Sequence, residues 1–109
     1  PLLLGGGSGP RLLSHLFEWG DGWMPIRNPK GSFVDDVVSV RRLAEEAGRD
    51  PASISITVMN APQSVDELVE LGELGVDRVV FTIWPQEPDA VLSELDRFTS
   101  IADSFLSRT

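Results

Sequence analysis

The apolar residues of this chain follow two alternating patterns, which together predict four successive strand–helix units. Four short apolar stretches are typical of buried strands, and after each one apolar residues recur every three or four positions, as on one face of an amphipathic helix. Strands are expected at 2–4, 22–26, 54–59 and 78–84, and helices at 10–19, 32–48, 64–75 and from about 91 to the end of the chain.

Glycine and small polar residues mark where these helices begin and end. Gly20 and Gly48 follow the first two apolar stripes and are expected to end these helices, Gly20 in the left-handed region of the backbone. Ser32 is expected to begin the second helix. Ser64 stands three residues before Glu67, a spacing that predicts a capping box at the start of the third helix.

Strands that alternate with helices at this spacing predict a parallel sheet with right-handed crossovers. The sheet could be open with helices on both faces, or it could be an arc of a barrel with helices on one face only. A sheet covered on both faces should be apolar on both, whereas the last two strands alternate an aliphatic face with a mixed one, which favours the arc. The aliphatic face carries Ile54, Ile56, Val58, Val79, Phe81 and Ile83, and the mixed face carries Ser55, Thr57, Met59, Arg78, Val80, Thr82 and Trp84.

A complete barrel of this kind needs eight strands and about 250 residues, so four units in 109 residues form half of one. We therefore predict a single α/β domain over residues 1–109, a (βα)4 half-barrel. Such a half leaves two strand edges and one sheet face uncovered. Two copies related by a two-fold axis would close an eight-stranded barrel, so a homodimer, or a larger even-numbered assembly, is expected.

The composition of the chain argues against several classes of binding partner and site. The 17 acidic and 9 basic residues give a net charge of −8, which argues against nucleic acid or an anionic membrane. The chain has no cysteine and one histidine, so neither a disulfide, a thiol nucleophile nor a metal site is expected. Without a long apolar stretch or a signal peptide, a cytoplasmic location is expected. The chain starts directly on an apolar strand without methionine, as a piece of a longer protein would.

The segment Gly5-Gly6-Gly7-Ser8-Gly9 is the strongest candidate for ligand binding. It stands between a predicted strand and a predicted helix, where backbone amides and the helix dipole bind phosphate groups, and the Ser8 hydroxyl could add a donor. Its spacing matches neither the dinucleotide-binding fingerprint nor the Walker motif. The alternative interpretation is a flexible turn before a helix that begins with proline.

Other residues are weaker candidates for a functional role. Trp23 and Trp84 stand at or near strand ends, where an indole could stack on a planar ligand, although a tryptophan placed like Trp23 is more often a buried core residue. Arg78 begins the fourth strand, at the amino end of the barrel, where residues usually serve stability. His15 lies within a helix beside its apolar stripe and is expected to be partly exposed. Because no nucleophile, acid and base stand out together, the catalytic residues remain unassigned.

Four segments resemble the luciferase-like flavin monooxygenase family, and the branch that uses the deazaflavin coenzyme F-420 is the most similar. They are residues 1–9, 20–25, 47–51 and 74–81. The resemblance implies that the chain corresponds to strands five to eight of a TIM (β/α)8 barrel. It also implies that Leu4, Gly5, Gly6, Gly7 and Ser8 approach the ring and phosphate of flavin mononucleotide (FMN) or of coenzyme F-420, and that Trp23 and Trp84 border the same pocket.

Two functions follow from this resemblance. The chain is expected to be the cofactor-binding half of an oxidoreductase or monooxygenase that works through a flavin or deazaflavin. The alternative is a catalytically silent half-barrel whose only activity is self-association. The family's amino-terminal half, which carries most of its acid–base residues, has no counterpart here, so turnover by this chain alone is not expected.

Overall fold

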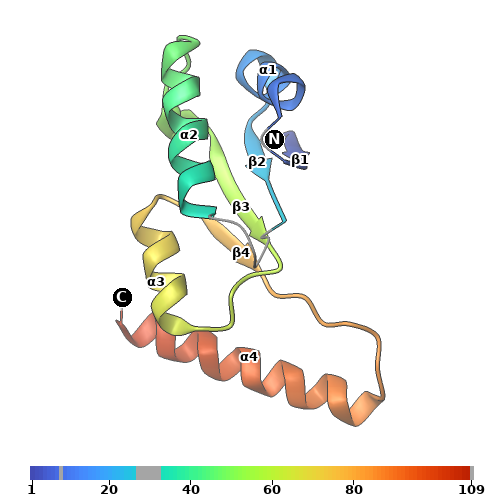
Figure 1. Ribbon diagram of the computed structural model, residues 1–109. Helices are drawn as coiled ribbons and strands as arrows, with labels where there is room; N and C mark the ends of the chain where they lie inside the picture. Colours follow the sequence, from blue (N-terminus) through green and yellow to red (C-terminus); the bar gives the residue numbers. More distant parts are fainter. Residues whose placement is uncertain (8, 27–32, 109) are drawn as a thin grey trace.

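The computed structural model describes residues 1–7, 9–26 and 33–108, and within them four β-strands alternate with four α-helices (Figure 1). Ser32, expected to begin the second helix, lies outside the described residues. A short 3-10 helix, η1, precedes the third strand. The elements are β1 (Leu3–Gly5), α1 (Pro10–Trp19), β2 (Gly22–Met24), α2 (Phe33–Glu46), η1 (Pro51–Ser53), β3 (Ser55–Met59), α3 (Val65–Glu73), β4 (Arg78–Val80) and α4 (Pro88–Arg108).

The four strands form one parallel sheet in the order β1-β2-β3-β4. This confirms the α/β class and the succession of strand–helix units. In a doubly wound sheet the strand order reverses at a switch point, whereas here each strand lies beside the one that follows it in sequence. The order is therefore compatible with an arc of a barrel.

One hydrophobic core lies between the sheet and the helices. Leu16 of α1, Val40 of α2 and Ile56 of β3 are all within 1% of complete burial. The strand register places Leu4, Trp23 and Ile56 side by side, so these side chains share the face toward the helices. Val58 and Val79 pair on the same face and pack into the same core. The prediction that the aliphatic face packs under the helices is thus confirmed for β3 and β4.

The opposite face of the sheet is more open. Met24, Met59 and Val80 are half-buried there, and Ile26, which bridges to Met59 just after β2, is 71% exposed. Thr57 is the exception, being 3% exposed in the middle of the sheet. This face therefore combines apolar side chains with access to solvent, as the mixed pattern predicts.

The last unit differs from the prediction. β4 ends at Val80 instead of Trp84, because its neighbour β3 ends at Met59 and Asn60 turns the chain away with a φ of 56°. Ala61 still donates a backbone hydrogen bond to Val80 O, at 3.0 Å, but residues 81–87 then leave the sheet as an extended connection (Figure 1). The prediction of a strand that continues to Trp84 is corrected accordingly.

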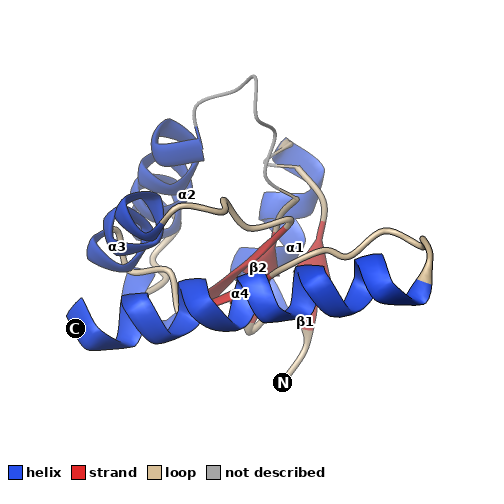
Figure 2. Ribbon diagram, turned by 90° about the horizontal axis from the view of Figure 1, so that it is seen from below, coloured by secondary structure: helices blue, strands red, loops and turns tan. Residues whose placement is uncertain are grey.

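Helix α4 lies beyond the carboxyl ends of the strands and packs mainly against α3 (Figures 1 and 2). Of its predicted apolar stripe only Phe98 is buried, in a stacked contact with Phe81 at 4.6 Å, whereas Leu95 is 47% exposed. Although α4 is the longest described helix, neither it nor any other helix in the described part of the chain is long and apolar enough to cross a membrane.

Two predicted helix ends are also corrected. Gly20 does end α1, but its backbone is extended, with a φ of −76°. Glycine is needed there for space instead, since a Cβ atom would lie 3.1 Å from the Leu16 Cα atom. Ser64 stands at the N-cap of α3 without a hydrogen bond from its side chain, so the predicted capping box with Glu67 is not formed. Gly48 follows the end of α2 as predicted, and its φ of 81° lies in the left-handed region.

Candidate functional site

The glycine turn, defined here as Gly5, Gly6, Gly7 and Gly9, connects the carboxyl end of β1 to the amino end of α1. Gly6 has a φ of 134°, a conformation that residues with a side chain rarely adopt. Gly9 is the N-cap of α1, and Pro10 follows as the first helical residue. Ser8, the fifth candidate of this segment, lies outside the described residues.

The turn leaves its backbone open to a ligand. A Cβ atom added at Gly7 or Gly9 would meet nothing within 4 Å, whereas one added at Gly6 would lie 3.1 Å from the Leu12 Cδ1 atom. The N-cap Gly9 offers no side-chain oxygen to the first N–H groups of α1, and the first turn contains no acidic residue. It contains the exposed Arg11 instead. Uncapped N–H groups, a positive dipole end and a cation together suit an anion such as phosphate.

Trp23 supports this turn from inside the core. Its side chain is only 2% exposed, stacks on Phe33 with ring centroids 6.2 Å apart, and donates a hydrogen bond from Nε1 to Gly6 O at 3.2 Å. The Leu4 side chain packs into the same core. The expectation that Trp23 borders a ligand pocket is therefore corrected: its ring is buried among the helices, as the core interpretation proposed, and it holds the backbone of the turn in place.

Trp84 is accessible and lies outside the sheet. It is 71% exposed and stands four residues beyond the end of β4, on the connection to α4. Because this connection leaves the sheet, the strand order does not place Trp84 relative to the glycine turn. That Trp84 borders a ligand pocket at this turn therefore stays a prediction.

Arg49 has a role that the sequence argument did not assign. Its guanidinium donates hydrogen bonds to the carbonyl oxygens at the end of α1, namely those of Leu16 and Phe17 at 3.2 Å and of Gly20 at 2.8 Å. Its Nε atom donates to Ser53 Oγ at 2.8 Å. Arg49 thus joins α1 to the connection before β3, and its position directly after Gly48 was the only available signal.

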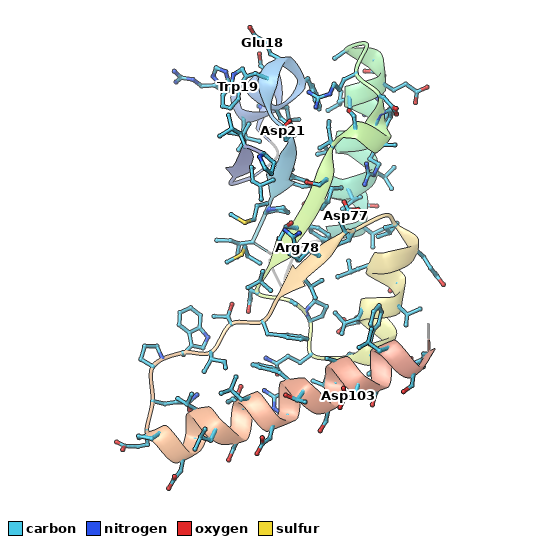
Figure 3. All side chains as sticks on the ribbon, turned by 180° about the vertical axis from the view of Figure 1, so that it is seen from behind. Glu18, Trp19, Asp21, Asp77, Arg78 and Asp103 are labelled. Atoms are coloured by element: carbon cyan, nitrogen blue, oxygen red, sulfur yellow. The ribbon has the colours of Figure 1, made fainter. Side chains whose placement is uncertain are left out.

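Two aspartates hold the amino ends of the strands in the same way. Asp21 donates its backbone N–H to Leu2 O and accepts the Leu2 N–H at Oδ2, at 2.9 and 2.7 Å. Asp77 repeats this exchange with Ile56, at 2.9 Å for both bonds. Each aspartate directly precedes its strand, Asp21 before β2 and Asp77 before β4, and both are labelled in Figure 3. Their hydrogen bonds therefore fix the amino ends of these strands to the neighbouring strands.

A groove of about 520 Å³ between α1 and α2 is the main competing site. Leu13, Phe17 and Leu43 line it, and Glu46 is its only charged lining residue. A ligand site normally adds several convergent polar groups to apolar walls, and this groove lacks them. Within the described residues no cluster of potential metal ligands is present either.

The chain matches no known protein-family model, and no curated protein and no solved structure is significantly similar to it. Two of the segments that carry the resemblance have structural roles here. Residues 47–51 contain Gly48 and Arg49, and residues 74–81 contain Asp77. The functional argument therefore depends on the geometry of the glycine turn.

Proposed function

We propose that this chain is the cofactor-binding half of a luciferase-like oxidoreductase, equivalent to strands five to eight of its TIM barrel, and that the glycine turn binds the phosphate of FMN or of the deazaflavin coenzyme F-420. The observation that carries the proposal is the open, uncapped entry into α1: Gly7 and Gly9 face free space, and Arg11 supplies positive charge. Ligands of βα barrels bind at the carboxyl end of the strands, which is where this turn lies.

Each residue of the turn has a distinct task in this proposal. The backbone N–H groups of Gly7, Gly9 and Arg11 would face the phosphate, and Pro10 between them has no N–H that would need a partner. Trp23 would keep the turn in position through Gly6 O. When bound, the flavin or deazaflavin supplies hydride transfer, while this chain binds and orients it.

The test compares FMN with riboflavin, which has the same ring and no phosphate. Titration followed by flavin fluorescence should show saturable FMN binding and at least about tenfold weaker riboflavin binding, as the loss of one well-placed charge interaction implies. Equal affinities for the two compounds would contradict phosphate binding at the turn.

Two variants assign the binding to this turn. Arg11→Glu reverses the charge beside the turn and should weaken FMN binding by about tenfold while leaving riboflavin unaffected. Arg42→Glu makes the same charge change on α2, where the Arg42 side chain is 61% exposed, and should leave both affinities unchanged. If both variants weaken FMN binding equally, only net charge matters and the assignment fails. If no flavin binds at all, the alternative of a silent, self-associating half-barrel replaces this proposal.

A further inference from the structure

Helix α4 has a sequence that repeats every seven residues. Each heptad begins with an aspartate, has valine or phenylalanine two positions later and leucine or threonine three positions later, and continues with serine. The three heptads begin at Asp89, Asp96 and Asp103. Because seven residues make almost two helical turns, equivalent residues lie in columns along α4. A heptad pattern of this kind is typical of a helix that packs lengthwise against another helix.

One column of the repeat faces the protein's own core. It consists of Val91, Phe98 and Phe105, which are buried or half-buried. The Phe98 ring stacks on Phe81, and Phe105 lines a cavity whose other walls come from α3 and from residues in and beside β4. This column therefore packs α4 against its own chain.

A second column, next to the first, is apolar and exposed. We call Leu92, Leu95 and Leu106 the leucine seam; they are 58%, 47% and 67% exposed. Leu92 and Leu95 are i, i+3 neighbours, and Leu106 lies about three turns further along the same side. Figures 1 and 2 show that the amino-terminal half of α4, which carries Leu92 and Leu95, extends past α3. The apolar surface of α4 is thus wider than its own chain covers.

A row of aspartates borders the leucine seam. Asp89, Asp96 and Asp103 are exposed and follow one another at intervals of about 10.5 Å along the helix. Among the described residues no hydrogen bond or ion pair engages their carboxylates. Asp89 and Asp96 stand three residues before and four residues after Leu92, so their carboxylates lie beside the seam. In the usual heptad notation the seam occupies positions a and d, and the aspartates occupy position e, where charges select the partner helix.

We propose that the leucine seam and the aspartate row form a docking surface for a basic amphipathic helix of another protein. Such a helix would bury apolar side chains against the seam and place one lysine or arginine per heptad opposite each aspartate. This surface lies on α4 and does not involve the glycine turn, so it goes beyond the proposed cofactor site.

Charge argues against a second copy of α4 as the occupant. In an antiparallel pair of these helices, position e faces position e, so one aspartate row would meet the other. In a parallel pair, position e faces position g, which here is the column of Val91, Phe98 and Phe105 that already packs against its own chain. Neither arrangement gives the aspartates a cationic partner, whereas a basic helix does.

The first experiment uses a synthetic peptide of three heptads with leucine at positions a and d and lysine at e and g. The same peptide with glutamate in place of lysine is its control. Fluorescence anisotropy of the labelled lysine peptide should show saturable binding to the protein, at least about tenfold tighter than that of the glutamate peptide. Absence of binding by the lysine peptide, or equal binding of the two peptides, would overturn the proposal.

A matched pair of variants tests whether the peptide binds at the leucine seam. Leu92→Gln should weaken binding of the lysine peptide about tenfold, because the exposed part of this leucine is no longer available for burial. Val38→Gln removes an apolar side chain of similar exposure, 55% against 58%, on α2 and should leave the affinity unchanged. Equal losses in the two variants would show that the peptide does not recognise the seam and would overturn the proposal.

A second pair tests the aspartate row. Asp96→Asn combined with Asp103→Asn should weaken binding of the lysine peptide about fivefold at low ionic strength. Glu18→Gln combined with Glu45→Gln removes as much charge from exposed sites on α1 and α2 and should have little effect. Equal effects would mean that only net charge attracts the peptide, which contradicts the proposal. If Leu92→Gln converts a wild-type oligomer into a monomer, a second copy covers the seam and the basic partner is overturned.

Discussion

Replacing Arg49 with methionine should destabilise this fold by well over the loss of an exposed charge. Methionine keeps most of the aliphatic stem and removes the guanidinium. The structure then loses the hydrogen bonds to Leu16 O, Phe17 O and Gly20 O, which connect the end of α1 to residues about thirty positions later.

The size of the effect follows from the partners of the guanidinium. A hydrogen bond that involves a charged group contributes about 1.5–3 kcal/mol, but carbonyl groups at a helix end regain water when they lose their donor. Counting one to two bonds as lost in full gives about 1.5–6 kcal/mol. Arg42→Met is the matched control, because Arg42 forms only an exposed pair with Glu46, at 3.1 Å, and should cost about 0.3–0.5 kcal/mol.

The measurement is urea unfolding, followed by circular dichroism and analysed by linear extrapolation at constant slope. Both variants remove one positive charge, so the difference between them reports the hydrogen bonds of Arg49 alone. A difference below about 0.5 kcal/mol would refute the role assigned to Arg49.

Two further pairs of variants test the packing by the same assay. Gly20→Ala places a Cβ atom 3.1 Å from backbone and side-chain atoms and should lower the free energy of unfolding by about 1–3 kcal/mol. Gly72 lies within α3, and a Cβ atom there would meet no atom inside 4 Å. Gly72→Ala should therefore raise the free energy of unfolding by about 0.5–1 kcal/mol. Effects of the same sign would contradict this. Ile56→Ala should lower it by about 2–5 kcal/mol and Ser55→Ala by far less, because only Ile56 faces the helices; equal losses would remove the one-sided core.

The elements that the sequence predicted best are those with local boundaries. Helix α1 runs from Pro10 to Trp19 as expected, because a proline begins it, a glycine follows it and its apolar spacing is regular between them. The alternation in β3 correctly placed Ile56 and Val58 under the helices. These features depend on residues that are neighbours in the sequence.

The features that the sequence missed depend on contacts between distant residues. β4 ends early because Asn60, eighteen residues before its first residue, turns the neighbouring chain away. The apolar stripe of α4 showed that the helix has an apolar face but not what covers it. β2 has only three residues, so its pattern could not decide on which face Trp23 lies, since a shift of one residue reverses every side chain.

The candidate site was predicted in its position but not in its construction. The glycine turn lies between β1 and α1 as expected. The sequence grouped Trp23 and Trp84 with it, whereas the structure places Trp23 beneath the turn, in the core, and Trp84 on the connection that follows β4. The end of β4 depends on its neighbour β3, which no local pattern encodes.

The most direct test of the account is light scattering on the purified protein saturated with FMN, with flavin absorbance recorded across the same chromatographic peak. The account predicts one peak at twice 11.9 kDa that carries flavin absorbance. A peak at 11.9 kDa without flavin would contradict both the half-barrel assembly and the cofactor site.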